Sequence, residues 1–387
     1  MKLPKRSIAA LFDFLNGKSI KPGGEGEIPV YGSNGIIGGT AESLYQDAVV
    51  IGRVGAYCGS VAYCRGPFWA SDNTIVAAAK DGQILPRFGF YLLKSMDLNR
   101  WRGGAAQPLL THTVLRGLSA NVPEIVVQER ILHILTAYDD LIENNTKRIE
   151  ILEEMARSLF REWFINFRFP GHEKAKFVRS PLGKAPDGWP VVPFDAAVDI
   201  SPRTEVPKEG EKPFLPMTSL SNDSMLISQV ESREGNSGAK FKNGDTLFAR
   251  ITPCLENGKT GFVQFLSDDA VGFGSTEFIV LREKLLTREM VYLLAREPSF
   301  RDHAIKSMSG ASGRQRVQEK CFATYLVAAP PREVARTFSA LASPLFRQVY
   351  VLAKRNDILR DTRDLLLPRL ISGEIDVSSL PAEPAAS

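Results

Sequence analysis

Apolar residues recur every three or four positions through residues 124–168, and neither Pro nor Gly interrupts residues 124–164. The repeating positions form two sets, each with a period of seven residues, which is a heptad seam of about five heptads. The first set is Gln128, Leu135, Ile142, Ile149, Ala156 and Trp163, and the second is Ile131, Tyr138, Asn145, Leu152 and Leu159. This pattern predicts a long helix that packs against another helix. Pro123 precedes the first turn, where a missing N–H costs nothing.

A second ladder of the same kind begins at Arg332, at an offset of 207 residues. Its sets are Ala335, Ala342, Val349, Asn356, Arg363 and Leu370, and Phe338, Leu345, Leu352, Leu359 and Leu366. Each helix could instead be an ordinary core helix, but two matching seams favour a pair that packs together.

Asn145 and Asn356 are the only Asn residues in the two seams. Polar seam residues can fix the register of paired helices. Placing the two Asn residues opposite each other in an antiparallel pair makes facing residue numbers sum to 501. Trp163 then faces Phe338, and Tyr138 faces Arg363 in a predicted cation–π contact.

Short strands and turns fill the rest of the chain. Before the first helix we expect strands at Ile28–Val30, Ala48–Arg53, near Val61 and at Thr74–Ala79, and a helix over Pro86–Leu98. A Pro- and Gly-rich linker over residues 169–190 follows the long helix. Residues 191–330 then repeat the first plan, and Gln315–Pro331 aligns without gaps on Gln107–Pro123 at an offset of 208. The chain therefore reads as a tandem duplication.

The predicted fold is α+β, with two similar α/β domains separated by two long antiparallel helices that form a coiled coil, arranged as a pseudo-twofold tandem repeat. The predicted segments are a first domain (residues 1–123), a central helix (124–168), a second domain (169–330, of which 169–190 is the linker) and a distal helix with its tail (331–387).

Composition places the chain among globular proteins, because 44% of its 387 residues are hydrophobic and 24% are charged. Its four Cys residues are too few and too irregularly spaced for a disulfide framework or a zinc site. No signal peptide or membrane-length apolar run is visible, so we expect a cytoplasmic protein with no membrane partner. Residues 1–123 contain 13 Lys+Arg and 8 Asp+Glu, a mild basic excess, whereas residues 124–168 contain 6 and 9. The acidic helix is more plausible as a strut than as a phosphate-binding surface.

The sequence contains no recognisable catalytic constellation. It has no Asp-x-Lys or Glu-x-Lys nuclease spacing, no Asn/Asp-Pro-Pro-Tyr amino-methylation motif and no G-x-G-x-x-G loop. Gly17-Lys18-Ser19 and Gly258-Lys259-Thr260 lack the upstream Gly of a P-loop. We therefore expect a duplicated binding protein with no cofactor, no metal and no catalytic residue.

Several stretches resemble the specificity subunit of type I restriction–modification enzymes. They are Ile28-Pro29-Val30-Tyr31-Gly32-Ser33-Asn34-Gly35, the Gly-rich loops closing on Gln107 and Gln315, the helix entry Pro123…Gln128-Glu129-Arg130-Ile131, and the ending Leu367-Pro368-Arg369-Leu370-Ile371-Ser372-Gly373-Glu374-Ile375. The second repeat departs from this pattern, with Lys212-Pro213-Phe214-Leu215 in place of Ile-Pro-Val-Tyr.

The resemblance implies a non-catalytic subunit whose two target-recognition domains each read one half of a bipartite sequence in double-stranded DNA. It also implies that the subunit docks two methyltransferase subunits, that motor–nuclease restriction subunits join the assembly, and that these partners hold the catalytic motifs. We expect the helices to set the length of the unread spacer between the half-sites.

Candidate DNA contacts are residue types that read base edges or hold phosphates. In the first domain they are Tyr31, Ser33, Asn34, Arg53, Tyr57, Asn73, Arg102 and Gln107. In the second they are Arg250, Asn257, Lys259, Thr276, Lys306, Arg314 and Gln315. Any of these could instead cap a turn or brace the fold, and Trp101 could stack on DNA or close its loop onto the core.

Two alternatives remain at this stage. The chain could be a non-catalytic coiled-coil adaptor that binds proteins or carbohydrate through two globular ends. It could also be an enzyme with an unrecognised site at Cys58 or Cys64. DNA binding predicts an affinity that falls steeply with salt, and an adaptor need show no such dependence.

Overall fold

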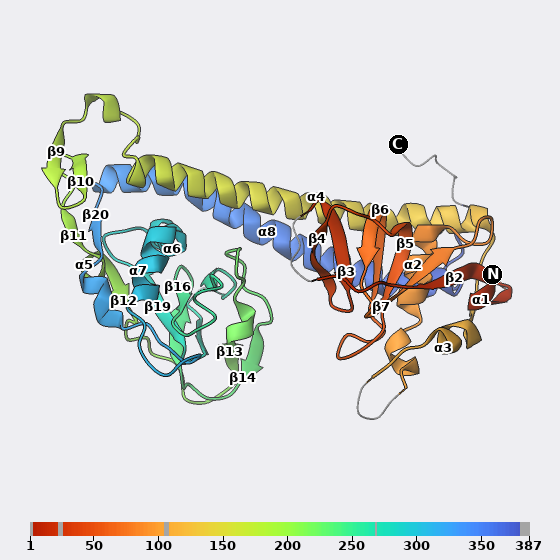
Figure 1. Ribbon diagram of the computed structural model, residues 1–387. Helices are drawn as coiled ribbons and strands as arrows, with labels where there is room; N and C mark the ends of the chain where they lie inside the picture. Colours follow the sequence, from red (N-terminus) through yellow and green to blue (C-terminus); the bar gives the residue numbers. More distant parts are fainter. Residues whose placement is uncertain (1–2, 22–25, 104–107, 268, 380–387) are drawn as a thin grey trace. The chain divides into compact units, whose positions relative to one another are not determined.

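The computed structural model describes residues 3–21, 26–103, 108–267 and 269–379. It divides into two compact units, which are described separately below. Unit 1 comprises residues 1–142 and 357–387, and unit 2 comprises residues 143–356. Two long helices, α4 (Ile125–Phe160) and α8 (Arg332–Ile371), contribute one part to each unit (Figure 1).

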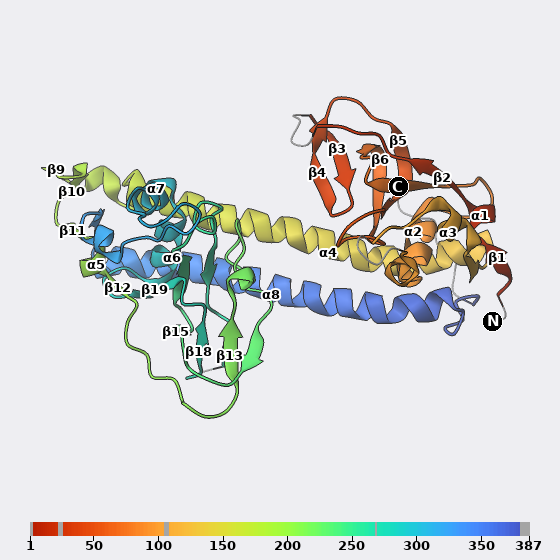
Figure 2. The same ribbon diagram turned by 60° about the horizontal axis from the view of Figure 1, so that its bottom comes forward.

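Within each unit α4 and α8 lie side by side and run in opposite directions (Figures 1 and 2). In unit 2, Asn145 contacts Asn356, and the rings of Trp163 and Phe338 have centroids 5.8 Å apart. In unit 1, Arg363 donates a 2.5 Å hydrogen bond to Asp139. The predicted central helix continues past α4 as a π-helical turn at Arg161–Ile165.

One predicted seam contact is absent. Tyr138 was expected to meet the Arg363 guanidinium, but that guanidinium binds the carboxylates of Asp139 and Asp364 instead. A charged, hydrogen-bonded partner beside the seam attracts a guanidinium more strongly than the face of a neighbouring ring does.

Unit 1 is a mixed α/β domain built on a six-stranded sheet, together with a two-stranded pair of β1 and β8. Its strands are β1 (Lys5–Ser7), β2 (Phe12–Asn16), β3 (Ile28–Gly32), β4 (Gly35–Thr40), β5 (Tyr45–Gly52), β6 (Val61–Ala70), β7 (Thr74–Ala79) and β8 (Ser119–Asn121). Its short helices are α1 (Ile8–Leu11), α2 (Pro86–Ser95), η1 (Leu98–Trp101) and α3 (His112–Gly117). The strand over Thr74–Ala79 lies where the sequence predicted it, because its run of small and β-branched residues is buried.

The sheet of unit 1 has the order β2-β7-β5-β6-β3-β4, and β3 runs parallel to β6. A bulge interrupts the β5–β6 ladder between Gln46 and Ala48, where Asp47 and Gly66 both have positive φ. Gly66 N–H donates to the Asp47 carboxylate at 2.8 Å, which closes the bulge. A bulge of this kind bends its strand and increases the local twist.

Unit 2 is also a mixed α/β domain. Its strands are β9 (Phe177–Ser180), β10 (Gly183–Pro186), β11 (Val191–Pro193), β12 (Val198–Ile200), β13 (Lys212–Leu215), β14 (Glu231–Arg233), β15 (Ala239–Lys242), β16 (Thr246–Ala249), β17 (Thr260–Phe262), β18 (Val271–Gly274), β19 (Phe278–Glu283) and β20 (Leu326–Ala328). Its short helices are η3 (His172–Lys174), α5 (Phe194–Ala197), η4 (Met217–Ser219), α6 (Arg288–Arg296), α7 (Pro298–Lys306) and η5 (Glu319–Ala323). The stretch predicted as a linker forms the β9–β10 hairpin.

The strand order of unit 2 matches that of unit 1. Its two four-stranded sheets have the orders β12-β19-β16-β17 and β14-β13-β18-β15, which correspond to β2-β7-β5-β6 and β4-β3-β6-β5. The strands equivalent to β5 and β6 are each divided in two, at the place where the bulge bends unit 1. The parallel pair recurs as β13 with β18. Flanking pairs also correspond, because β1–β8 has its counterpart in β11–β20.

Buried and half-buried carboxylates hold each α/β part on its portion of the long helices. In unit 2, Glu153 of α4 accepts hydrogen bonds from Ser224 Oγ at 2.6 Å and from Met225 N at 2.9 Å. Glu289 of α6 accepts from Ser343 Oγ of α8 at 2.5 Å. In unit 1, the Tyr91 hydroxyl of α2 donates to Asp139 of α4. These contacts add direction to apolar packing that by itself is non-directional.

Candidate nucleic-acid interface

Four loops of unit 1 converge beside the start of β7. Ser33 Oγ donates to Asn73 O at 2.6 Å, and Ser60 Oγ donates to Ser33 O at 2.6 Å. Arg53 N donates to the same Asn73 carbonyl at 2.9 Å. The β3–β4 turn, the loop after β5 and the β6–β7 turn therefore form one surface. Ser60 belongs to it but carried no signal in the sequence, because its role depends on a partner 27 residues away.

The fourth loop follows η1. Backbone bridges join Val54 to Leu109 and Gly103 to Leu109, so the loop that contains Arg102 lies against the loop that contains Tyr57. Gly59 is required there: its φ is +88°, and a Cβ would lie 2.5 Å from Asn99 N. Arg102 and Asn34 are exposed, and the side chain of Tyr57 is 60% exposed.

One first-domain candidate, Tyr31, does not belong to this exposed surface. Tyr31 packs edge-on against Phe68, with ring centroids 5.8 Å apart, and burial together with a hydrogen bond to Cys64 raises its pKa to about 12. Its ring therefore supports the hairpin from inside. Gln107 lies outside the described residues.

Unit 2 brings together the corresponding loops. Arg250 N donates to Glu277 O at 2.9 Å, and Val317 N donates to Arg250 O at 2.8 Å. In unit 1, Arg53 N bonds Asn73 O, and Arg53 O accepts from Leu110 N at 2.9 Å. Arg53 and Arg250 thus occupy equivalent positions, and the Nε of each is buried without a hydrogen-bond partner among the described residues.

The other second-domain candidates fall into two groups. Thr276, Arg314 and Gln315 lie beside Arg250, because Gln315 N donates to Thr252 Oγ1 at 3.1 Å and bridges join Arg316 to Ile251 and Ser309. Asn257 and Lys306 are exposed at a turn and at the end of α7. Lys259 instead donates to the carbonyls of Met217 and Leu220, so its ammonium group is used within its own domain.

Sequence reasoning missed a charged pair and a cleft in the same region. Arg316 forms an ion pair with Glu277 across this loop cluster, with a shortest N–O distance of 2.6 Å. A cleft of about 400 Å³ lies beside Arg250 and Thr276, and its lining includes Arg203 and Lys240. Neither cation lies in a motif, so only the folded chain identifies them.

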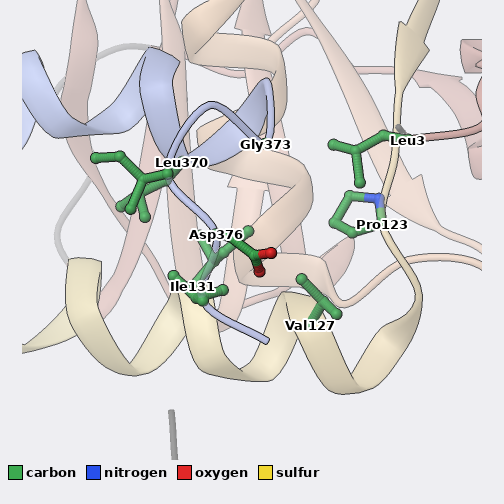
Figure 3. Close-up of a pocket in the computed structure, with 9 residues that line it drawn as sticks. Leu3, Pro123, Val127, Ile131, Leu370, Gly373 and Asp376 are labelled. Carbon is green, nitrogen blue, oxygen red and sulfur yellow. The ribbon is translucent and has the colours of Figure 1, made fainter. Parts of the chain in front are cut away.

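A smaller cavity in unit 1 is structural. It encloses about 10 Å³ between the start of α4 and the segment that follows α8, which is room for about one water molecule. Figure 3 shows Ile131 and Leu370 on facing elements, with Gly373 and Asp376 on the segment that crosses α4. Arg130 holds this segment by donating to Ser378 O at 2.5 Å.

Groups suited to redox or metal chemistry do not gather in the described parts of the chain. No cluster of three or more His, Cys, Asp or Glu residues there could hold a metal ion. The four Cys residues are free thiols, and burial raises the pKa of Cys58 and Cys64, which favours the unreactive protonated form. Among the described helices none is long and apolar enough to cross a membrane.

Known proteins share both sequence and fold with this chain. Residues 5–154 match the family model described as the type I restriction modification DNA specificity domain. The fold is shared with the type I restriction–modification S subunit from M. genitalium, with a TM-score of 0.58, 16% identity and coverage of 96% of each chain. The class resemblance seen in the sequence is therefore confirmed, and the protein is a relative of type I restriction enzyme specificity subunits.

Two curated relatives extend the match beyond the first domain. The MjaIX specificity subunit of Methanocaldococcus jannaschii is 25% identical over 337 residues, which cover 83% of this chain and 76% of the relative. The HindI specificity subunit of Haemophilus influenzae is 23% identical over 364 residues, covering 76% of this chain and 78% of the relative.

Proposed function

We propose that this chain recognises DNA for a type I restriction–modification complex, and that each of its two α/β domains reads one half of a bipartite target. The observation that carries this proposal is the doubled loop cluster. The same strand order in both units leads to equivalent loops, with Arg53 and Arg250 at matching backbone positions. The tandem duplication predicted from the sequence accounts for this correspondence.

The chemistry of the loops suits duplex DNA. Arg side chains bond guanine edges and phosphates, Asn and Gln bond adenine, and exposed hydroxyls and backbone N–H groups contact phosphates. Unit 1 offers exposed Asn34, Asn73, Tyr57 and Arg102 on loops that the sheet supports. A rigid sheet carrying recognition loops lets those loops vary without loss of the fold. The relatives' names support the same role, whereas nothing in the comparisons supports the adaptor alternative.

The paired helices are proposed to act as a coiled coil that sets the spacer between the half-sites and docks methyltransferase subunits. Large apolar side chains face solvent along both helices, and such exposure is typical of interaction surfaces. They are Val126, Leu141, Ile151, Met155, Leu341, Ile358 and Leu365, each 49% exposed or more. Two methyltransferase subunits and motor–nuclease restriction subunits are the partners that this role requires, and the catalytic groups belong to them.

Selection from random duplexes tests the proposal. The full chain, copurified with its methyltransferase subunits, should enrich two short sequences separated by a constant unread spacer. The logarithm of its association constant should fall linearly with the logarithm of the salt concentration. The chain alone should neither methylate nor cleave DNA when S-adenosylmethionine, ATP and magnesium are supplied. Enrichment of a single continuous site, or salt-independent binding, would count against bipartite recognition.

A further inference from the structure

The cleft of unit 2 has an apolar floor and polar walls. It encloses about 400 Å³ between the loop after β12, strand β15 and the loops around Arg250 and Thr276. Phe278, Val280 and Ala239 contribute apolar surface, and Ser201 and Thr276 contribute hydroxyl groups. Such a lining can pack against a sugar while it donates hydrogen bonds to an adjacent oxyanion.

The charges in the cleft do not cancel. Its cations are Arg203, Lys240 and Arg250, and its one acidic residue is Glu319. Arg250 Nη1 pairs with Glu319 at 3.1 Å, so these two charges offset each other. Arg203 is exposed, Lys240 is half-buried, and neither forms an ion pair in the part of the chain that the structure describes. Two positive charges therefore remain for a ligand.

The hydrogen bonds that Arg250 already makes bear on which kind of ligand the cleft can bind. Its Nη1 binds Glu319 and its Nη2 donates to Val317 O at 3.1 Å, so one N–H of each terminal nitrogen is already used within the domain. Arg203 and Lys240 extend from different elements and do not form one planar fork. Separate cations beside hydroxyl groups suit a phosphate, which accepts hydrogen bonds from several directions.

The loop after β12 differs from the corresponding stretch of unit 1. Strand pairing sets Val198 at the position of Phe12, because Val198 pairs with Glu283 in β19 and Phe12 pairs with Ala79 in β7. Strand β2 continues to Asn16, whereas β12 ends at Ile200 and is followed by Ser201 with a φ of 45°. The loop that brings Arg203 to the cleft therefore leaves its strand earlier than the equivalent chain of unit 1 does.

Building on the proposed function, we propose that this cleft binds a backbone phosphate of the second DNA half-site, held by Arg203 and Lys240, with the deoxyribose on the apolar floor. The contact positions the second domain on the duplex and carries no sequence preference.

The test compares the R203Q/K240Q double variant with the wild type. Each is the full chain, copurified with its methyltransferase subunits. The double variant should lower the magnitude of the salt slope, d log K against d log[salt], by about 1, and should weaken all second-half-site sequences alike. The matched control is K184Q, which removes an exposed cation of the β9–β10 hairpin and should leave the slope unchanged. Thermal unfolding curves should coincide for all three proteins.

Neutral methylphosphonates placed singly along the second half-site locate the contact. One position should weaken wild-type binding and have no further effect on the double variant. An unchanged salt slope would overturn the phosphate site while leaving DNA recognition intact, and an altered base preference would show that the cleft reads sequence. Absence of any specific DNA binding by the wild type would overturn the proposed function and this site together.

Discussion

Asn145 donates a hydrogen bond from its Nδ2 to the Oδ1 of Asn356 at 2.9 Å, and both side chains are buried. Asn356 in turn donates to Thr146 Oγ1 at 3.2 Å. The two Asn residues therefore face each other, as in the predicted antiparallel register in which facing residue numbers sum to 501. An amide pair flanked by apolar seam residues favours one register, because a slipped register would bury both amides away from each other.

Replacing one member of this pair should destabilise unit 2 more than replacing both. Asn145→Leu or Asn356→Leu alone leaves a buried amide short of a partner, which we expect to cost about 1–3 kcal/mol. The Asn145→Leu/Asn356→Leu double variant should recover much of that loss, because apolar groups then face each other. Urea unfolding of the four proteins measures the coupling. Strictly additive losses would show that the two amides act independently.

Arg53→Ala and Arg102→Ala should weaken recognition of the first half-site only, by about 1–3 kcal/mol if the side chain reads a base. The reason is that each unit has its own core and its own loop cluster. Affinities on duplexes with either half-site scrambled provide the measurement. Arg65→Ala, which removes an exposed cation from β6 of the same unit, is the control. Equal losses on both scrambled duplexes would exclude independent reading.

Two buried carboxylates of unit 2, Glu153 and Glu289, should respond to pH with opposite signs. Burial raises the pKa of Glu153 despite hydrogen bonds from Ser224 and Met225, so its folded form holds a proton more tightly than the unfolded chain does. Its contribution to stability therefore falls as pH rises from the ordinary carboxyl value, about 4.3, to its raised folded pKa. Glu153→Gln keeps the accepting oxygen and should gain stability relative to wild type across that window.

Glu289 is the opposite case. Burial alone would raise its pKa, but hydrogen bonds from Ser343, Arg288 and Ser339 outweigh burial and lower it. Its stabilisation is present above the ordinary carboxyl value and is lost as pH falls through the lowered folded pKa. Glu289→Gln should therefore be most destabilising near neutral pH and less so in acid. Urea midpoints of both variants between pH 4 and 8 test the pair, and parallel pH curves would refute the assignment.

The exposed apolar stripe of α8 should be needed for assembly and not for folding. Ile358 and Leu365 are 65% and 72% exposed, so Ile358→Asp/Leu365→Asp removes little buried contact. We expect an unchanged melting temperature and reduced copurification with the methyltransferase subunits. Asp361→Asn, on the same helix, is a polar control. Full retention of the methyltransferase subunits by the Asp variant would place the docking surface elsewhere.

The length of the helix pair should determine the preferred spacer. One heptad added after Asn145 and another after Asn356 preserve the seam and lengthen both helices by about 10 Å at 1.5 Å per residue. That corresponds to about three base pairs at 3.4 Å each. The half-sites should remain the same, because no loop changes. Three base pairs also rotate one half-site by about 100° about the duplex, so some affinity should be lost.

Selection from duplexes with variable spacers, with methyltransferase subunits present, measures this effect. A shift toward a spacer about three base pairs longer supports the helices as a ruler. If the elongated protein still prefers the original spacer, the helices serve as a docking surface and the spacer is set elsewhere.

Much of this architecture follows from local pattern in the sequence. Apolar positions with a period of seven specify α4 and α8, and in α4 no Pro or Gly interrupts the pattern. The strand at Thr74–Ala79 follows from the same kind of local evidence. The two seam Asn residues indicated the register, since the one Asn in each seam has one favourable partner.

Contacts between distant residues were decided only by the tertiary structure. Tyr31 packs against Phe68 and lies beside Cys64. Lys259 donates hydrogen bonds to two backbone carbonyls, and Arg363 binds Asp139 in preference to Tyr138. The cleft around Arg203 and Lys240 forms where the loop after β12, strand β15 and the loops around Arg250 and Thr276 meet. Periodicity reports which face of an element is buried, but the choice of partner for a polar side chain depends on groups that only folding brings within a few ångströms.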